Sequence, residues 1–267
     1  MDSSTSFVPH CAQNDRAGAG SKSGKLFLWA LLLAMGLSAN IANAGEITVS
    51  GAASLKDALQ EIGHVYQQLH PQNRVNFNFG SSGTLQKQIE QGAPVDVFVA
   101  ASDANLNALL KQNLADKHAR FNLASGELVL IAPRGSKLRG MAGIKNARNF
   151  AIGGPGVPAG DYARQALKWY RLDNVVASKL VYGKDVRGTL QLVASGNADA
   201  GLVYRTDALS TRNVAIVGAL SPHSHQAIRY PMALLTDAPN ARDGRDFVRF
   251  CKGAAVKAIL RKYGFTR

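Results

Sequence analysis

The chain of 267 residues carries 31 Lys and Arg against 18 Asp and Glu, which gives a formal net charge of +13. The basic residues are dispersed, with neither a long basic run nor zinc-finger spacing, and this argues against a nucleic-acid-binding protein. We interpret the charge as a source of solubility, of long-range attraction for anions, or of a match to an acidic partner surface.

Residues 1–44 predict a cleaved secretory signal peptide with an N-terminal extension. Lys22 and Lys25 precede an apolar run at 26–39, which is shorter than the roughly 20 residues of a membrane span. Small residues follow, so we expect cleavage after Ala44. No cysteine stands at that point, and we therefore expect a soluble periplasmic protein without a lipid anchor. The remaining 223 residues keep a charge of +12 and can bury one large core or two of ordinary domain size.

The two cysteines are Cys11, which leaves with the signal segment, and Cys251. A single remaining cysteine excludes an internal disulfide and a multi-cysteine metal site. We interpret Cys251 as a buried structural thiol.

Strand and helix patterns alternate along the rest of the chain. The expected strands are 47–49, 75–79, 95–100, 128–132, 150–152, 200–204, 214–217 and 227–235. The expected helices are 55–69, 85–92, 105–114, 159–172, 186–194 and 243–263. This order predicts an α/β fold with mainly parallel sheets flanked by helices, which bind ligands at the carboxyl ends of their strands.

Three strand-to-helix turns, at 52–55, 80–84 and 157–160, contain small or hydroxyl-bearing residues but no lysine. The start of a helix exposes backbone N–H groups and the positive end of its dipole, and a serine adds a hydroxyl donor. Several such turns that converge would form a site of neutral donors for one small oxyanion. Such a site is suited to binding and release rather than to chemistry on the anion.

These turns and a further helix start at 186 occur in both halves of the chain, so a ligand that touches all of them must lie in a cleft between two lobes. The expected lobes are 45–127 with 229–267, and 128–228. The chain then crosses between the lobes near 125–130 and near 226–235, and its last helix packs back on the first lobe. Two crossings form a natural hinge.

Six short motifs follow one another along the mature chain. They are Ala52-Ala53-Ser54-Leu55, Gly80-Ser81-Ser82-Gly83-Thr84-Leu85, Gly92-Ala93-Pro94-Val95-Asp96-Val97-Phe98, Val157-Pro158-Ala159-Gly160, Asp185-Val186-Arg187-Gly188 and Gly201-Leu202-Val203-Tyr204. Together they resemble the periplasmic molybdate-binding proteins of ABC importers, although each motif alone is weak. The resemblance implies a type II-like periplasmic binding fold, whose two α/β lobes close over molybdate or tungstate.

The resemblance also implies the ligand contacts. The residues that match the family's oxyanion-binding positions are Ser54, Ser82, Ala159, Val186 and Tyr204. It implies no cofactor and no direct ligand to a metal cation, because molybdenum is held as molybdate by these residues. The implied partners are the oxyanion and the membrane permease of an ABC importer, with the protein itself a monomer. One departure is Gly83, where the better-known members have serine, and it changes how the loop beside Ser82 is held.

The chemistry of these five positions supports the same roles independently. Serine and tyrosine hydroxyls and backbone N–H groups are neutral donors, and a fully deprotonated tetrahedral dianion presents only acceptors. Molybdate, tungstate and sulfate fit this donor set, whereas monohydrogen phosphate needs an acceptor for its proton. The argument holds if no carboxylate reaches the site, so we expect Asp161 and Asp185 to point elsewhere or to pair with Arg187.

Plainer interpretations remain for several residues. Ser54 also fits a helix N-cap, and Tyr204 a core aromatic. We interpret Arg187 as part of a structural pair or of the lip of the cleft rather than as an anion ligand. Two histidines, His223 and His225, favour a polar loop over a metal site.

Other classes of function are less well supported. The chain lacks a Gly-x-Ser-x-Gly turn, a Walker lysine turn and a His-Glu-x-x-His helix, so we expect no enzymatic activity. A serine hydrolase or phosphatase that uses Ser54 or Ser82 would need a histidine or lysine beside the serine. A ligand-sensing regulatory domain would lack the signal peptide and carry a DNA-binding helix pair. A sulfate-binding protein is the serious alternative.

Overall fold

The computed structural model describes residues 45–266, all of which belong to one compact unit of the chain. The predicted signal segment, residues 1–44, lies outside the described residues. Within the described part, the helices are too short or too polar to span a bilayer.

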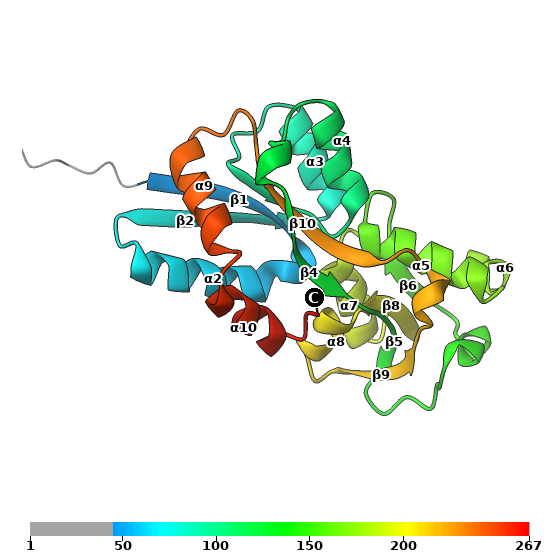
Figure 1. The fold of residues 1–267 in the computed structure, drawn as a ribbon. Coiled ribbons are helices and arrows are strands. Elements are labelled where there is room, and N and C mark those ends of the chain that lie inside the picture. The colour runs from blue at the N-terminus through cyan, green and yellow to red at the C-terminus, as the bar shows by residue number, and fades with distance from the viewer. Residues whose placement is uncertain (1–44, 267) are drawn as a thin grey trace, which may run out of the picture. The chain divides into compact units, whose positions relative to one another are not determined.

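Two five-stranded sheets form the framework of residues 45–266 (Figure 1). The strand order of the first sheet is β2-β1-β3-β10-β4, and that of the second is β7-β6-β8-β5-β9. The strands of the first are β1 (Gly45–Ala52), β2 (Asn73–Gly80), β3 (Val97–Val99), β4 (Phe121–Gly126) and β10 (Ile228–Leu234). Those of the second are β5 (Leu128–Pro133), β6 (Phe150–Gly153), β7 (Leu180–Gly183), β8 (Ala200–Tyr204) and β9 (Val214–Ala219). The first lobe is defined here by the first sheet with its helices, and the second lobe by the second.

Each sheet has four strands in one direction and a single reversed strand. In the first sheet β1 pairs in parallel with β2 and β3, while β10 runs antiparallel to β3 and β4. In the second, β6 pairs in parallel with β7 and β8, while β5 runs antiparallel to β8 and β9. The predicted α/β fold with mainly parallel sheets is confirmed. The chain passes between the sheets from β4 to β5 and again from β9 to β10.

Helices cover both faces of the first sheet. They are α2 (Lys56–Leu69), α3 (Ser82–Glu90), α4 (Asp103–Lys111), α9 (Ala241–Phe250) and α10 (Ala254–Lys262). The α3 and α4 helices lie on one side of the sheet, and α2 and α10 lie on the other (Figure 1). Successive residues of β3 face these two sides: Val97 and Val99 pack in one core and Phe98 in the other. This explains why that strand is almost entirely apolar.

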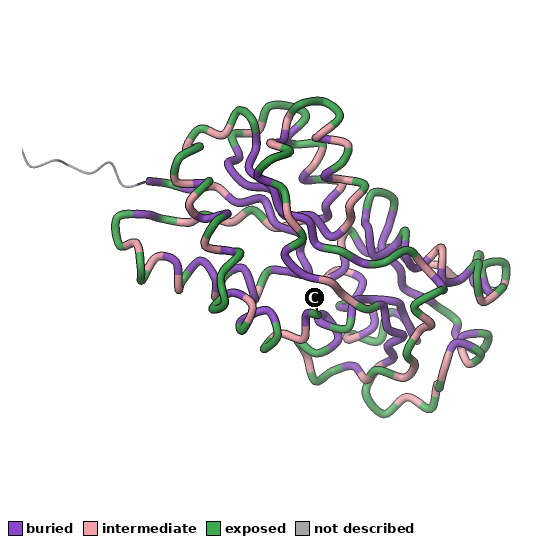
Figure 2. The backbone as a smooth tube through the Cα atoms, viewed as in Figure 1, coloured by how far each residue is buried: buried purple, intermediate pink, exposed green. Residues whose placement is uncertain are grey.

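Helices pack against the second sheet, and most of them follow one of its strands. These helices are α5 (Pro158–Trp169), α6 (Asp173–Val176), α7 (Val186–Ala194) and α8 (Arg205–Leu209). Short 3-10 turns are η1 (Ala53–Leu55), η2 (Lys117–Ala119), η3 (Met141–Asn146), η4 (Ala177–Lys179) and η5 (Pro222–Ser224). The central strands of both sheets are largely buried, whereas the edge strands β2, β4, β7 and β9 and the outer sides of the helices are more exposed (Figure 2).

Three details differ from the sequence-based expectation. The β4 and β7 strands were not predicted, because neither shows a strict alternation of apolar and polar residues. The predicted final helix at 243–263 is two helices, α9 and α10, separated at 251–253, where Gly253 adopts an extended conformation. Cys251 lies in this break and is buried, as expected, and burial raises the pKa of its thiol far above its ordinary value.

The last described residues return to the crossing between the lobes. Thr266 and Ser125 exchange two backbone hydrogen bonds, of 2.7 and 3.0 Å. Phe265 is buried with its ring 5.2 Å from that of Tyr230 on β10. The preceding helix α10 packs on α2, a helix of the first lobe.

Candidate functional site

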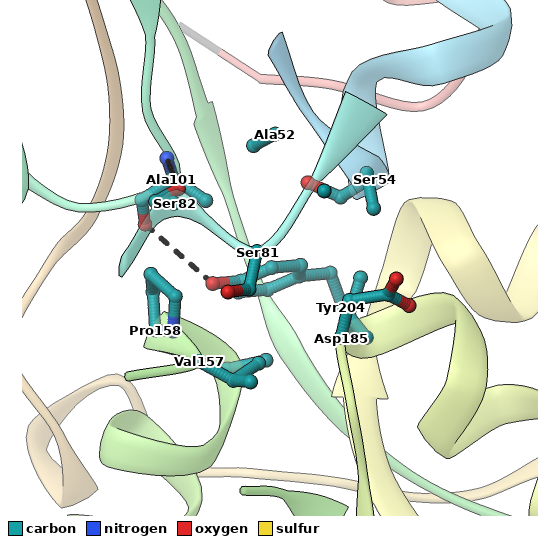
Figure 3. Close-up of a pocket in the computed structure, with 13 residues that line it drawn as sticks. Ala52, Ser54, Ser81, Ser82, Ala101, Val157, Pro158, Asp185 and Tyr204 are labelled. Atoms are coloured by element: carbon teal, nitrogen blue, oxygen red, sulfur yellow. Dashed lines mark hydrogen bonds between the residues drawn. The ribbon is translucent and has the colours of Figure 1, made fainter. Parts of the chain in front are cut away.

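A single cavity between the two lobes brings together all five residues that the sequence analysis selects (Figure 3). Its lining from the first lobe is Ala52, Ala53, Ser54, Gly80, Ser81, Ser82 and Ala101. Its lining from the second lobe is Val157, Pro158, Ala159, Asp185, Val186 and Tyr204. The cavity volume is about 10 Å³, far below the roughly 300–1,000 Å³ of pockets for drug-sized ligands. It is therefore suited to a small ion.

Each of the five residues lies at or near the junction between a strand and the helix that follows it. Ser82 is the first residue of α3, Val186 the first of α7 and Ala159 the second of α5. Ser54 lies in η1, immediately before α2, and Tyr204 ends β8, immediately before α8. The carboxyl ends of strands from both sheets thus face one cavity, which is the usual place for a ligand in an open α/β sheet.

The second lobe contributes main-chain donors. The first N–H groups of a helix have no acceptor within the helix. In α5, Gly160 N–H donates to Val157 O (2.9 Å), and in α7, Gly188 N–H donates to Asp185 Oδ1 (2.8 Å). The N–H groups closer to each helix start, at Ala159 and Val186, therefore remain for a ligand in the cavity.

The first lobe contributes the two serine hydroxyls, which differ in their surroundings. Ser82 Oγ accepts a hydrogen bond from Ala101 N–H (2.9 Å), which leaves its own proton available to a ligand. Ser54 is 3% exposed, and its Oγ makes no hydrogen bond to any of the residues from 45 to 266. A candidate partner of Ser54 Oγ is the Tyr230 hydroxyl. Burial raises the pKa of Tyr230, and the nearby Ser54 hydroxyl opposes this increase. The two hydroxyls do not have the geometry of a hydrogen bond, however. A buried hydroxyl without a partner calls for a ligand or a water molecule.

Neither Ser54 nor Ser82 serves as the N-cap of a helix. Ser81, rather than Ser82, caps α3 by accepting a hydrogen bond from Thr84 N–H (3.1 Å). The Ser54 side chain makes no capping hydrogen bond to the first turn of α2. Neither predicted binding serine is therefore occupied as a cap.

Tyr204 closes the cavity from the second lobe. Its side chain is 1% exposed, and its hydroxyl donates a long hydrogen bond of 3.5 Å to Ala101 O of the first lobe (Figure 3). Burial raises the pKa of the Tyr204 hydroxyl well above its ordinary value, so the group remains a protonated donor. The core-aromatic interpretation is also correct, because the ring packs against Tyr162 and Tyr230, with centroid distances of 6.4 and 5.7 Å.

The two acidic residues beside the motifs both make contacts within the second lobe. Asp185 lines the cavity, but its carboxylate caps α7 through Gly188 N–H and points away from Ser82 in Figure 3. Asp161 forms an ion pair with Arg164 (2.7 Å). The expectation that they point elsewhere agrees with these contacts.

The alternative expectation, that these aspartates pair with Arg187, is wrong. The Arg187 guanidinium extends toward α2 and α8, where its Nη2 lies 2.6 Å from Asp57 Oδ2 and its Nε 2.6 Å from Asp207 Oδ1. Asp185 is prevented from joining them because its side chain turns back to cap its own helix. Arg187 is thus part of a structural cluster, as the sequence indicates, but with different partners.

Asp207 gives this cluster a dependence on pH. Burial raises the pKa of its carboxyl to about 7, although the Arg187 guanidinium opposes the shift. The folded protein therefore binds this proton more tightly than the unfolded chain does. Protonation adds to stability at low pH, and this contribution is lost as the pH rises through about 7.

We expect Asp207→Asn to remove this part of the pH dependence. The free energy of unfolding of the wild type should decline more between about pH 5 and about pH 8 than that of the variant, because only the wild type loses the favourable protonation. Urea unfolding of both proteins at the two pH values measures the difference. Equal changes in the two proteins would contradict the assignment.

The two lobes also meet through main-chain atoms beside the cavity. Gly83 N–H of the first lobe donates to Gly156 O of the second lobe (3.1 Å). A Cβ atom at position 83 would overlap this carbonyl oxygen and lie 3.0 Å from its carbon. Gly156 itself has φ +76°, a conformation that favours glycine. The departure from serine at position 83 therefore permits a close backbone contact between the lobes.

The cavity does not provide the groups that serine chemistry needs. Among the described residues its lining includes neither histidine nor lysine, so these offer no base beside a nucleophilic Ser54 or Ser82. His225 instead packs its ring 5.8 Å from that of Tyr162. Residues 45–266 contain no cluster of three or more His, Cys, Asp or Glu side chains suited to a metal cation.

The family model of bacterial extracellular solute-binding proteins matches residues 47–266. The chain belongs to this family. A relative of this solute-binding protein, the molybdate-binding protein ModA of Haemophilus influenzae, is 40% identical over 243 residues, which cover 88% of this chain and 95% of the relative.

Solved structures share the fold of this solute-binding protein. The periplasmic molybdate-binding protein of Azotobacter vinelandii has a TM-score of 0.76 at 23% identity, with 83% of this chain and 99% of that chain covered. The sulfate-binding protein SubI of Mycobacterium tuberculosis has a TM-score of 0.70 at 14% identity, with 82% and 86% covered. At these identities the likeness concerns the two-lobed fold alone, which both kinds of binding protein use.

Proposed function

We propose that this chain is an extracytoplasmic binding protein that captures molybdate, and also tungstate, and delivers it to the permease of an ABC importer. The Ser54 hydroxyl carries the proposal, because it is buried, has no partner among the described residues, and lines a cavity of neutral donors. The relative named for molybdate binding, which is 40% identical over most of both chains, supports this ligand. We place the protein in the periplasm as a monomer.

The donor set explains why the anion is a tetrahedral dianion. In our proposal Ser54 and Ser82 donate through hydroxyls, Ala159 and Val186 through N–H groups, and Tyr204 through its phenol. In this arrangement every group donates a hydrogen bond to the anion and none accepts one from it, which disfavours monohydrogen phosphate. Asp185 is the one acid among the described residues that line the cavity, and its carboxylate points away from Ser82 and accepts a hydrogen bond from Gly188 N–H through Oδ1.

Capture and release follow from donors that belong to different lobes. An anion that accepts hydrogen bonds from both lobes binds more tightly when the lobes touch than when they are apart. This difference in affinity determines how far binding shifts the protein toward the closed arrangement. The two crossings, β4 to β5 and β9 to β10, let the lobes separate again. The lining residues between 45 and 266 include no cation to hold the anion permanently, so a permease that separates the lobes releases it.

Thermal unfolding in the presence of molybdate, tungstate, sulfate or phosphate tests this proposal. At a thousandfold excess over Kd, binding adds about 4 kcal/mol to the stability. For a protein of this size we expect molybdate and tungstate to raise the melting temperature by roughly 10 °C, and phosphate to leave it unchanged.

Sulfate is the second candidate, because a sulfate-binding protein shares this fold and the donor set suits any tetrahedral dianion. A shift with sulfate and none with molybdate would replace the proposed ligand by sulfate. Shifts with none of the four anions would reject an oxyanion-binding function.

A further inference from the structure

An ion pair joins the two lobes immediately beside the candidate site. Asp57 belongs to α2 in the first lobe and Arg187 to α7 in the second, and their side chains approach to 2.6 Å. Asp57 lies three residues after Ser54, and Arg187 directly follows Val186. The pair thus connects the two helix starts that bear one candidate donor from each lobe.

The arginine is fixed to its own lobe before it meets Asp57. Its Nε lies 2.6 Å from Asp207 Oδ1, and its Nη1 donates to Ser210 Oγ (3.0 Å). Asp207 is completely buried, whereas the Asp57 side chain is 39% exposed. When the lobes separate, Arg187 therefore keeps two partners in the second lobe, and Asp57 is hydrated.

The Asp57–Arg187 pair differs in this respect from the other ion pairs within residues 45–266. Those of Arg164 with Asp161 and of Arg148 with Asp199 lie within the second lobe. The pairs that involve Asp103, Asp116, Asp246 and Glu61 lie within the first lobe. Among the described residues, only Asp57 and Arg187 form an ion pair whose formation depends on contact between the lobes.

We propose that Asp57 and Arg187 are positioning residues for oxyanion binding. When the lobes meet, the ion pair holds the starts of α2 and α7 at the spacing at which Ser54 and Val186 contact the same anion. The inference rests on the proposed function, because it assigns these two residues to the same binding event. It also gives Arg187 a role other than that of ligand, since two carboxylates engage its guanidinium and keep it from the cavity.

The sign of the electrostatic effect separates this role from a simple influence of charge. Asp57 is an anion close to a site for an anion, and its charge alone weakens binding. Neutralising it should therefore strengthen binding if it acts only through the field, and weaken binding if it acts by joining the lobes.

The test compares Asp57→Asn with Asp161→Asn. Both aspartates lie in the first turn of a helix at the cavity and pair with an arginine, at 2.6 and 2.7 Å, but Asp161 pairs within its own lobe. We expect Asp57→Asn to raise the Kd for molybdate about tenfold, mainly through faster dissociation. Asp161→Asn should leave the Kd unchanged or slightly lower, and Asp57→Glu should restore most of the affinity.

Titration calorimetry and stopped-flow dissociation give these values, and melting temperatures without ligand check that the variants fold. If another anion of the thermal series stabilises the wild type instead of molybdate, the comparison uses that anion. If the wild type binds and Asp57→Asn binds equally well, only the positioning role is overturned. If the wild type binds none of the anions, the proposed function and this inference are both rejected.

Discussion

Replacing Gly83 by alanine should weaken oxyanion binding about tenfold to a hundredfold without lowering the stability of the ligand-free protein. The added Cβ overlaps the carbonyl oxygen of Gly156 across the lobes, and a main-chain atom cannot turn aside as a side chain can. Overpacking of this kind costs about 1–3 kcal/mol, all of it in the arrangement in which the lobes touch. With the lobes apart, alanine favours the helix α3 by up to about 1 kcal/mol.

Gly188→Ala is the matched control for this effect. Gly188 also lies in the first turn of a helix at the site, but a Cβ there meets nothing nearer than 3.5 Å. We expect the control to bind molybdate with unchanged Kd in titration calorimetry. If Gly83→Ala bound as tightly as this control, the contact between Gly83 and Gly156 would not belong to the ligand-binding arrangement.

Ser54→Ala should lower the affinity for molybdate by roughly tenfold to a hundredfold while leaving the ligand-free melting temperature unchanged or slightly higher. A hydrogen bond to a charged group contributes about 1.5–3 kcal/mol, and this variant loses one such bond to the anion. The folded protein loses nothing in exchange, because Ser54 Oγ is buried without a hydrogen bond among the described residues.

Ser82→Ala provides the contrast to Ser54→Ala. It should also weaken binding, but it leaves the buried Ala101 N–H without its acceptor. A cost of about 1–3 kcal/mol should therefore lower the ligand-free melting temperature as well. Calorimetric titration and thermal unfolding of both variants separate the two effects. Unchanged affinity in Ser54→Ala would remove this residue from the proposed binding site.

The elements at the site could be predicted from the sequence because local signals determine them. The turns at 52–55, 80–84 and 157–160 have small or hydroxyl-bearing residues and follow predicted strands, and each becomes a strand-to-helix junction at the cavity. The carboxyl ends of parallel strands then gather at one edge of each sheet. The ligand contacts of individual residues remain predictions, since the geometry only brings those residues together.

The contacts between the lobes could not be predicted, because they join residues that are distant in the sequence. Asp57 and Arg187 are 130 positions apart, and nearer aspartates offered more obvious partners for the arginine. Ala101 was also missed, although it follows a strand that the sequence predicts. It contributes its backbone N–H and carbonyl groups, and every residue type except proline has both, so the sequence gives no signal for them. The approach of Gly83 to Gly156 likewise depends on how the two lobes meet.

The strand orders of the two sheets, β2-β1-β3 and β7-β6-β8 in their first three places, make the lobes topological counterparts. The segment after β1 bears Ser54 and that after β6 bears Ala159, while the segments after β2 and β7 bear Ser82 and Val186. The proposed donors therefore form corresponding pairs, in which one lobe offers hydroxyl groups and the other offers its main chain. Side-chain substitution can change the first member of each pair, whereas only substitution by proline would remove the N–H group of the second. Selection for a different anion is thus expected to act mainly on the first lobe and on Tyr204.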